Sequence, residues 1–159
     1  MHRSFRVVLS AVVACWMLLA FPACVRAAKL DAEEQAFVTL INRYRRQHGL
    51  RPLTISNTLD ASAVWMSRDM ATKRYFSHTD SRGRTFDVRL RAFGYRRYTT
   101  MGENIAAGGT TAKEVFRLWK QSPSHNANML KANYRVMGIA RVKSVRRPYR
   151  WYWTNDFGG

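Results

Sequence analysis

The amino-acid sequence predicts an α+β domain, in which helical segments fill most of the chain and a hairpin of strands closes it. Apolar residues recur at helical spacing in the first part, and apolar and polar residues alternate near the end. No repeat, low-complexity tract or linker interrupts the chain after residue 30. Because helices followed by strands favour a layered α+β domain over a doubly wound sheet, we expect one such domain over residues 28–159.

Each predicted helix opens on a residue that caps helix N-termini, and a glycine or a proline follows its end. Glu34 and Glu114 stand three positions after the first and the last of these caps, as in a capping box. Pro123 either ends the last helix or opens another. The expected helices begin at Asp31, near Asn57, at Thr85 and at Thr111.

Segments predicted to form strands lie near the end of the chain. Residues 136–142 are predicted to form one strand, and residues 146–148 a turn. Apolar and polar residues alternate over 149–154, which indicates a half-buried second strand. The segment from Gly102 to Gly109 is bounded by glycines, so we expect a turn there.

Residues 1–27 have the composition of a secretory signal peptide. Two arginines precede an uncharged apolar run over residues 7–21, and small residues before Ala28 offer a cleavage site. The run is shorter than the ~20 residues that a membrane-spanning helix requires. We therefore predict a secreted or periplasmic protein with no membrane span after cleavage. An uncleaved anchor helix and lipidation at Cys24 are the alternatives.

Both cysteines, Cys15 and Cys24, belong to this segment, so the predicted mature domain contains no disulfide. A packed core must supply its stability, which a domain of this size can form.

The chain carries 27 basic and 10 acidic residues, and removing the three arginines of residues 1–27 leaves a net charge of +14. Such a charge attracts lipid head groups and anionic envelope polymers. The alternative is that it only keeps the protein soluble. Because the arginines are spread over several segments, we expect no sequence-specific recognition of nucleic acid.

Three histidines follow residue 27, and two of them stand in polar loops. His48 falls at the end of the first helix, where the helix dipole favours a polar or positive group. His78 and His125 lie in polar segments of the kind in which binding residues concentrate. Glu103 is the only acid between Asp87 and Glu114. Spacing leaves open whether His78, Glu103 and His125 meet, because the two loop histidines are far apart and form no local zinc motif.

Six segments carry a resemblance to a known family when they are taken in order. They are YFSHTD (75–80), GENIA (102–106), WKQSPSH (119–125), NML (128–130), GIA (138–140) and YWTNDFG (152–158). Together they resemble the CAP superfamily, and more closely its short bacterial branch of SCP-like extracellular proteins. The resemblance covers residues 35–158. It implies a three-layer α-β-α sandwich with a small antiparallel sheet between helix layers, and one cleft that holds His78, Glu103 and His125.

The sequence departs from the family pattern at three positions. Eukaryotic members carry a second cleft acid where this chain has Ser122, so the cleft is expected to hold two imidazoles and one carboxylate beside Ser122. Asn126 and Asn155 stand where bacterial members often have Arg and Gln. The many cysteines of secreted eukaryotic members are absent.

The cleft residues support more than one function. Two neutral imidazoles, His78 and His125, can hold Zn²⁺ or another divalent cation, so a binding module for a metal, or for a lipid or envelope ligand, is the preferred interpretation. A metal-dependent hydrolase with Glu103 as candidate catalytic base is the alternative. A third hypothesis is an interaction protein that binds the envelope by charge. Nothing in the sequence activates Ser77 or Ser122 as a nucleophile.

Overall fold

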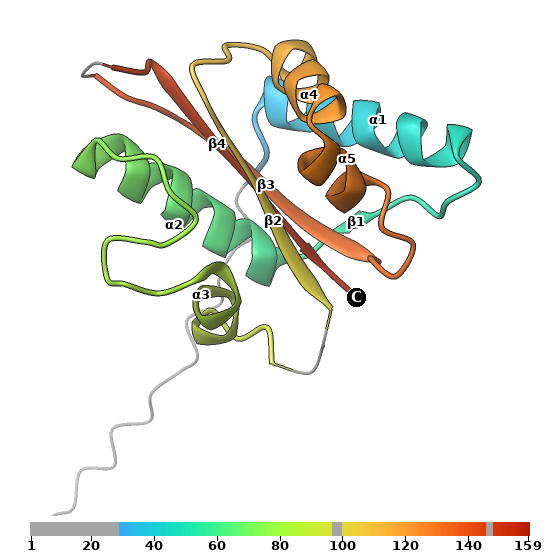
Figure 1. Ribbon diagram of the computed structural model, residues 1–159, viewed down its shortest axis with the longest axis horizontal. Coiled ribbons are helices and arrows are strands. Elements are labelled where there is room, and N and C mark those ends of the chain that lie inside the picture. The colour runs from blue at the N-terminus through green and yellow to red at the C-terminus, as the bar shows by residue number, and fades with distance from the viewer. Residues whose placement is uncertain (1–28, 97–99, 146–147) are drawn as a thin grey trace, which may run out of the picture.

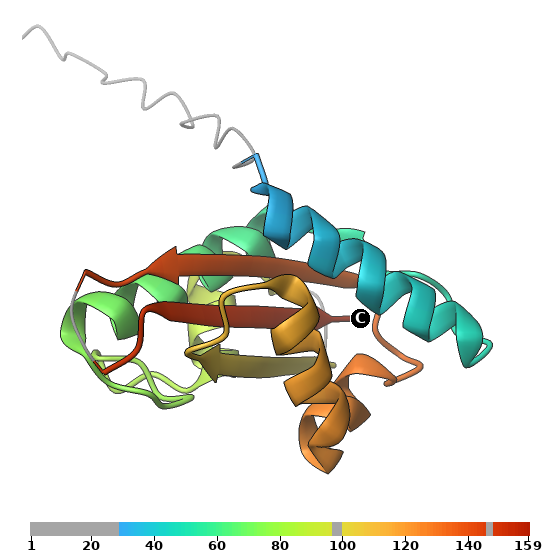
Figure 2. The ribbon, with the colours of Figure 1, turned by 90° about the horizontal axis from the view of Figure 1, so that it is seen from above.

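Helices cover both faces of one sheet in the computed structural model, which describes residues 29–96, 100–145 and 148–159. The predicted signal peptide lies outside the described residues. Helices α2 and α3 cover one face, and α1, α4 and α5 cover the other (Figures 1 and 2). The elements are α1 (Ala32–Gln47), β1 (Thr54–Ile55), α2 (Asn57–Lys73), α3 (Phe86–Ala92), β2 (Met101–Ala107), α4 (Ala112–Gln121), α5 (Pro123–Met129), β3 (Val136–Lys143) and β4 (Trp151–Gly158). The three-layer α-β-α sandwich is therefore confirmed.

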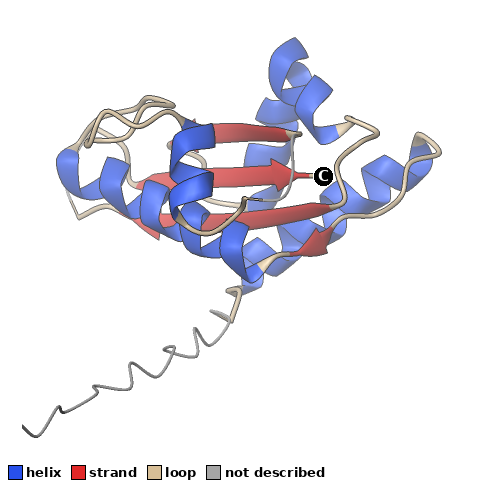
Figure 3. Cartoon of the chain, turned by 90° about the horizontal axis from the view of Figure 1, so that it is seen from below, coloured by secondary structure: helices blue, strands red, loops and turns tan. Residues whose placement is uncertain are grey.

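The sheet has the strand order β1-β3-β4-β2. Strand β4 pairs antiparallel with β3 on one side and with β2 on the other, while β1 pairs parallel with β3. The sheet is thus mixed rather than wholly antiparallel, although the parallel strand is only two residues long. Strand β2 forms the opposite edge, as Figure 3 shows.

The turn that was predicted between Gly102 and Gly109 is wrong, because most of this segment is strand β2. Gly102 serves close packing instead of a turn. A Cβ atom at this position would overlap the hydroxyl of Tyr134, which lies against the strand. The glycine signal in the sequence therefore reflects a close neighbour from another layer, which local patterns do not reveal.

The closing hairpin is confirmed, but the half-burial predicted for its second strand is wrong. Residues 152–158 of β4 are all buried. Strand β4 lies between two other strands, and a helix layer covers each of its faces. Its polar residues, such as Asn155 and Asp156, therefore lie inside the protein and need partners there.

The predicted helix starts follow the caps closely. The capping boxes of Asp31 with Glu34 and of Thr111 with Glu114 are both present. Ser56, rather than Asn57, caps α2. None of the described helices combines the length and the apolar character that crossing a bilayer would need.

The core has one apolar layer on each face of the sheet. On the α1 side, Phe37 packs edge-to-face against Trp119 with ring centroids 5.1 Å apart, and Trp153 lies beside them. On the α2 side, Met66 and Met70 pack against the sheet. All core clusters draw on residues 30–157, so a chain that starts at residue 28 retains the whole described core.

Candidate functional site

The predicted site residues gather along the edge strand β2, where both helix layers meet. Glu103 belongs to β2 itself. His78 approaches from the loop between α2 and α3, and His125 belongs to α5 in the other layer. Strand β2 is an edge of the described sheet, as Figure 1 shows. Side chains from the two layers can therefore meet across it.

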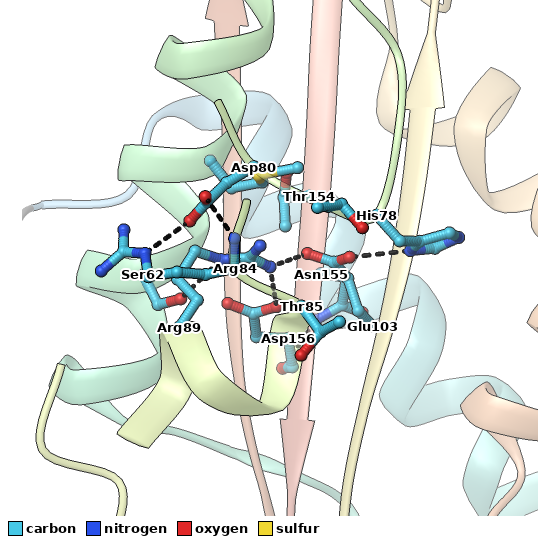
Figure 4. A network of polar contacts seen from close by, with 12 residues as sticks. Ser62, His78, Asp80, Arg84, Thr85, Arg89, Glu103, Thr154, Asn155 and Asp156 are labelled. Carbon is cyan, nitrogen blue, oxygen red and sulfur yellow. Dashed lines mark hydrogen bonds and ion pairs between the residues drawn. The ribbon is translucent and has the colours of Figure 1, made fainter. Parts of the chain in front are cut away.

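The imidazole of His78 is held by Glu103. Its Nδ1 lies 2.7 Å from Oε1 of Glu103, whose side chain is fully buried, while 52% of the His78 side chain is exposed. An ionised Glu103 can only accept hydrogen bonds, so Nδ1 of a neutral His78 carries the proton and Nε2 keeps its lone pair. The contact therefore fixes both the orientation and the tautomer of the ring (Figure 4).

A buried ionic cluster stands behind Glu103. Its second oxygen, Oε2, accepts a hydrogen bond from the guanidinium of Arg89, which is itself fully buried. Nε of Arg89 lies 3.4 Å from the hydroxyl of Ser62 on α2, and Nη2 lies 3.8 Å from a carboxyl oxygen of Asp156 on β4. One guanidinium therefore faces two carboxyl groups inside the protein (Figure 4).

The carboxyl groups of Glu103 and Asp156 differ in how strongly their surroundings disfavour ionisation. Burial, and next the nearby carboxylate of Glu103, raise the pKa of Asp156 well above its ordinary value. The buried position therefore disfavours the charged form of Asp156, and Arg89 contacts Glu103 more closely than it contacts Asp156. The contacts with Arg89 and His78 hold the Glu103 carboxyl group in place.

Replacing Asp156 with asparagine tests this protonation state. A raised pKa in the folded protein means that the stabilising contribution is complete below the unfolded pKa and is lost as pH rises through the folded pKa. We expect D156N to gain stability relative to the wild type as the pH rises from 5 to 9, because the wild type loses this contribution over that range. The gain over this range should be about 1.4 kcal/mol for each unit by which the folded pKa exceeds 5.

Urea denaturation at both pH values measures this effect. Asp69 is the control, because hydrogen bonds from Tyr75 and Ser81 lower its pKa against the opposing effect of burial. D69N should lose stability at neutral pH and gain nothing at pH 9. A D156N variant that is less stable than the wild type at pH 9 would show that the folded state does not raise the pKa of Asp156.

His125 has a local partner in Ser122, which precedes α5. Its Nδ1 lies 2.8 Å from the hydroxyl oxygen of Ser122. Burial, and next the charge of His78, lower the pKa of His125, so its imidazole stays neutral below the pH at which a free histidine protonates. The side chain of Asn104 on β2 donates to the backbone carbonyl of His125 at 3.0 Å and ties α5 to the strand.

The contact between Ser122 and His125 was not foreseen from the sequence. A serine within hydrogen-bond distance of a histidine is the first requirement of a nucleophile–base pair. A triad also needs an acid on the other ring nitrogen. Within the described residues, no carboxylate is hydrogen-bonded to His125, so the contact orients the imidazole.

Two hollows flank β2 where the sequence predicted a single cleft. The larger one, of about 560 Å³, is lined by His78 and Glu103 together with Asn128, Lys131 and Tyr134. The smaller one, of about 260 Å³, is lined by Ser122 and His125 together with Phe76, Leu118, Trp119 and Tyr149. The structure thus pairs His78 with Glu103 and His125 with Ser122. No described group of three or more His, Cys, Asp or Glu residues is arranged to hold a metal ion.

The outer edge of β2 is closed by side chains. Its carbonyl oxygens at three alternate positions each accept a hydrogen bond from a neighbouring layer. The pairs are Met101 with the Tyr134 hydroxyl at 3.0 Å, Glu103 with Asn128 Nδ2 at 3.2 Å, and Ile105 with Trp119 Nε1 at 3.0 Å. These bonds fix the strand between the two hollows.

Sequence reasoning missed Arg89 and Asp156. Arg89 stands three residues after Phe86 and next to Leu90, on the apolar side of α3, and an arginine in an apolar stripe was the available signal. Asp156 belongs to a strand whose second face was expected to be in solvent, so its burial was not foreseen. His48 lies outside the site, and its Nδ1 is 2.9 Å from the carbonyl oxygen of Tyr44 on α1.

Comparison with known proteins shows the family of this chain. The chain belongs to the CAP family, the cysteine-rich secretory protein family, whose model matches residues 38–157. The chain itself has no cysteine in the matched region.

Comparison with individual proteins gives the same class. The chain is 38% identical over 133 residues to the uncharacterized protein YkwD of Bacillus subtilis, a match that covers 83% of this chain and 49% of the relative. The chain therefore spans about half the length of this relative. Among solved structures, an extracellular SCP-domain protein of Bacillus anthracis is 27% identical with a TM-score of 0.68, over 79% of this chain and 40% of that one. An outer surface protein of Borrelia burgdorferi has a TM-score of 0.72 at 23% identity, over 84% of this chain and 98% of that one.

Proposed function

We propose that this CAP domain is an extracytoplasmic binding module in which His78 and His125 hold a divalent cation, with Zn²⁺ the foremost candidate. The carrying observation is the 2.7 Å contact between Nδ1 of His78 and the buried carboxylate of Glu103. Histidines that ligate metals commonly donate their other ring N–H to a carboxylate, which sets the tautomer and raises the basicity of the ligating nitrogen. The extracellular and outer-surface descriptions of two structural relatives support the location.

Two properties of the histidines support a cation bound by two protein ligands. His78 presents a free Nε2, and His125 is neutral because burial lowers its pKa. The charge of His78 contributes to that lowering, so the two imidazoles interact electrostatically across β2. A cation bound there would keep coordination positions for water or for an anionic ligand and would polarise what binds in them.

The geometry favours binding over hydrolysis, because Glu103 is poorly placed to act as a base. One of its oxygens faces His78 and the other faces Arg89, so both oxygens are already engaged within the protein, and the side chain is fully buried. A hydrogen bond from a guanidinium stabilises the ionised form and makes a carboxylate a weaker base. Glu103 is therefore a positioning residue for His78 in this proposal.

Calorimetric titration with Zn²⁺ at pH 7.5 tests the proposal on the protein without residues 1–27. We expect the wild type to bind one ion, and the variant with His78→Ala and His125→Ala to show no saturable binding. His48→Ala removes an exposed histidine outside the site and should bind as the wild type does. Equal binding by the double variant and the wild type would refute the proposed site.

The pH dependence of Zn²⁺ binding is a second readout of the same titration. Affinity should fall as the pH drops below ~6.5, where an unperturbed imidazole takes up a proton. Turnover of a hydrolase substrate that is lost in Glu103→Ala and His78→Ala alike would replace the binding module with the metal-dependent hydrolase.

A further inference from the structure

The surface of the domain is more basic than its net charge suggests, because acidic side chains are hidden. Six of the ten acids are buried, namely Glu34, Asp60, Asp69, Asp80, Glu103 and Asp156. Three others lie at the N-termini of α1 and α4 and are engaged there. Asp31 pairs with Arg141, Glu33 accepts from the backbone of α4, and Glu114 completes a capping box. Only Asp87, on α3, lies elsewhere. Away from the start of α1 and α4, the exposed charged side chains of the described residues are therefore almost all positive.

Exposed apolar side chains gather at one place on this cationic surface. Phe76, Leu118 and Tyr149 are 48%, 43% and 40% exposed, and all three line the smaller hollow beside His125. The rings of Phe76 and Tyr149 lie 6.3 Å apart. These three residues, which come from a loop, from α4 and from the β3–β4 hairpin, are called the apolar rim below.

The β3–β4 hairpin extends this surface. Val145, which is 95% exposed, and Tyr149 belong to the same connection, which the hydrogen bond from Ser144 to the carbonyl oxygen of Arg150 closes at 2.7 Å. Of the six large apolar residues that are exposed in the described chain, only Ile55 and Val88 lie on other elements. The grouping is therefore a local feature rather than a general property of the surface.

An exposed basic residue stands within two positions in sequence of each member of the apolar rim. Arg74 precedes Phe76 by two positions, Arg117 adjoins Leu118, and Arg150 adjoins Tyr149. The acids of the neighbouring α2 and of the following loop are buried and bonded internally, as with Asp69 and Asp80. The surface thus combines protruding apolar groups with positive charge and lacks an opposing exposed carboxylate in the described residues.

We propose that the apolar rim docks on the surface of an anionic lipid bilayer. Apolar side chains gain free energy by entering the boundary between head groups and acyl chains, while flanking arginines are attracted by anionic lipids. A soluble anionic polymer would satisfy the charge but would leave Phe76, Leu118 and Tyr149 without an apolar environment. The combination of both features selects the bilayer.

Docking would place the candidate metal site at the membrane. Ser122 and His125 line the same hollow as the apolar rim, so their side chains would face the head groups. The docking itself uses neither His78 nor Glu103. The two proposals therefore fail or succeed separately.

Sedimentation with lipid vesicles tests the docking on the protein without residues 1–27, whose apolar run would itself bind lipid. One set of vesicles contains phosphatidylcholine alone, and the other contains equal parts of phosphatidylcholine and phosphatidylglycerol. We expect binding to the second set, which weakens as salt is added because the attraction is screened. Phe76→Ser, Leu118→Ser and Tyr149→Ser should each weaken it about fivefold or more, as expected from the transfer of a large apolar side chain.

Matched variants distinguish docking through the apolar rim from non-specific electrostatic binding. Ile55→Ser and Val88→Ser remove similarly exposed apolar side chains elsewhere and should bind as the wild type does. His78→Ala, which alters the candidate metal site and leaves the hollow of the apolar rim intact, should also bind fully in the presence of a chelator. If the triple rim variant binds phosphatidylglycerol vesicles as the wild type does, or if soluble polyphosphate binds as tightly as the vesicles, the rim is not a membrane surface.

Discussion

Replacing Arg89 with methionine is expected to destabilise the domain by about 3–5 kcal/mol at neutral pH, the usual cost of removing one partner from a buried ion pair. Methionine fills much of the same space, so the loss comes from charge rather than from volume. Glu103 would remain buried as a carboxylate without its guanidinium, next to Asp156. Since whole domains of this size are stable by about 5–15 kcal/mol, the loss is a large share of the total.

The pH dependence of this variant identifies the cause. A buried carboxylate without a counterion is costly, and protonation removes that cost. The variant should therefore recover stability relative to the wild type as the pH falls from 7 to 5. Arg91→Met, on the exposed side of the same helix, should change stability by less than ~0.5 kcal/mol. Urea denaturation at both pH values measures all three proteins, and a pH-independent loss in R89M would point to packing instead.

Replacing Gly138 with alanine should cost about 3 kcal/mol, at the upper end of the usual range for overpacking. Its added Cβ would overlap backbone atoms of Leu59 and Asp60 in α2. Backbone atoms within a helix cannot move away by a rotamer change, as side-chain atoms can. Helix α2 would have to move away from β3. The hydrogen bond between the Asp60 carboxylate and the backbone N–H of Ile139, at 3.3 Å, would lengthen.

A second glycine separates crowding from backbone strain in this experiment. Gly49 has a positive φ of 70°, but a Cβ there would meet nothing within 4 Å. Gly49→Ala should therefore cost about 1 kcal/mol from conformation alone. Thermal unfolding of both variants gives the comparison. Equal losses of stability in the two variants would mean that α2 can shift away from β3 at little cost in free energy.

Much of the fold followed from local signals. Capping residues such as Asp31 and Thr111 marked helix starts correctly, because a cap is a property of four consecutive residues. Strand β2 was missed, since the glycine at 102 is needed for Tyr134 of a distant segment. The burial of both faces of β4 depends on which strands become its neighbours, and alternation within one strand does not carry that information.

Only part of the candidate site was predicted, because the roles of the other residues depend on contacts between distant segments. His78, Glu103 and His125 were identified from their segments, and the structure brings them to one strand. Arg89 and Asp156 were not, because each matters only through its contact with Glu103. The two hollows beside β2 also depend on side chains from both layers, such as Tyr134 and Trp119.

The side chains that cover the edge of β2 affect whether another protein chain can pair with this strand. An exposed strand invites other chains to extend the sheet, which leads to aggregates and exchanged segments. An incoming strand at β2 would find its carbonyl partners already taken by Tyr134, Asn128 and Trp119. At the opposite edge, β1 offers only two residues. The same side chains that line the two hollows thus protect this edge against extension of the sheet by another chain.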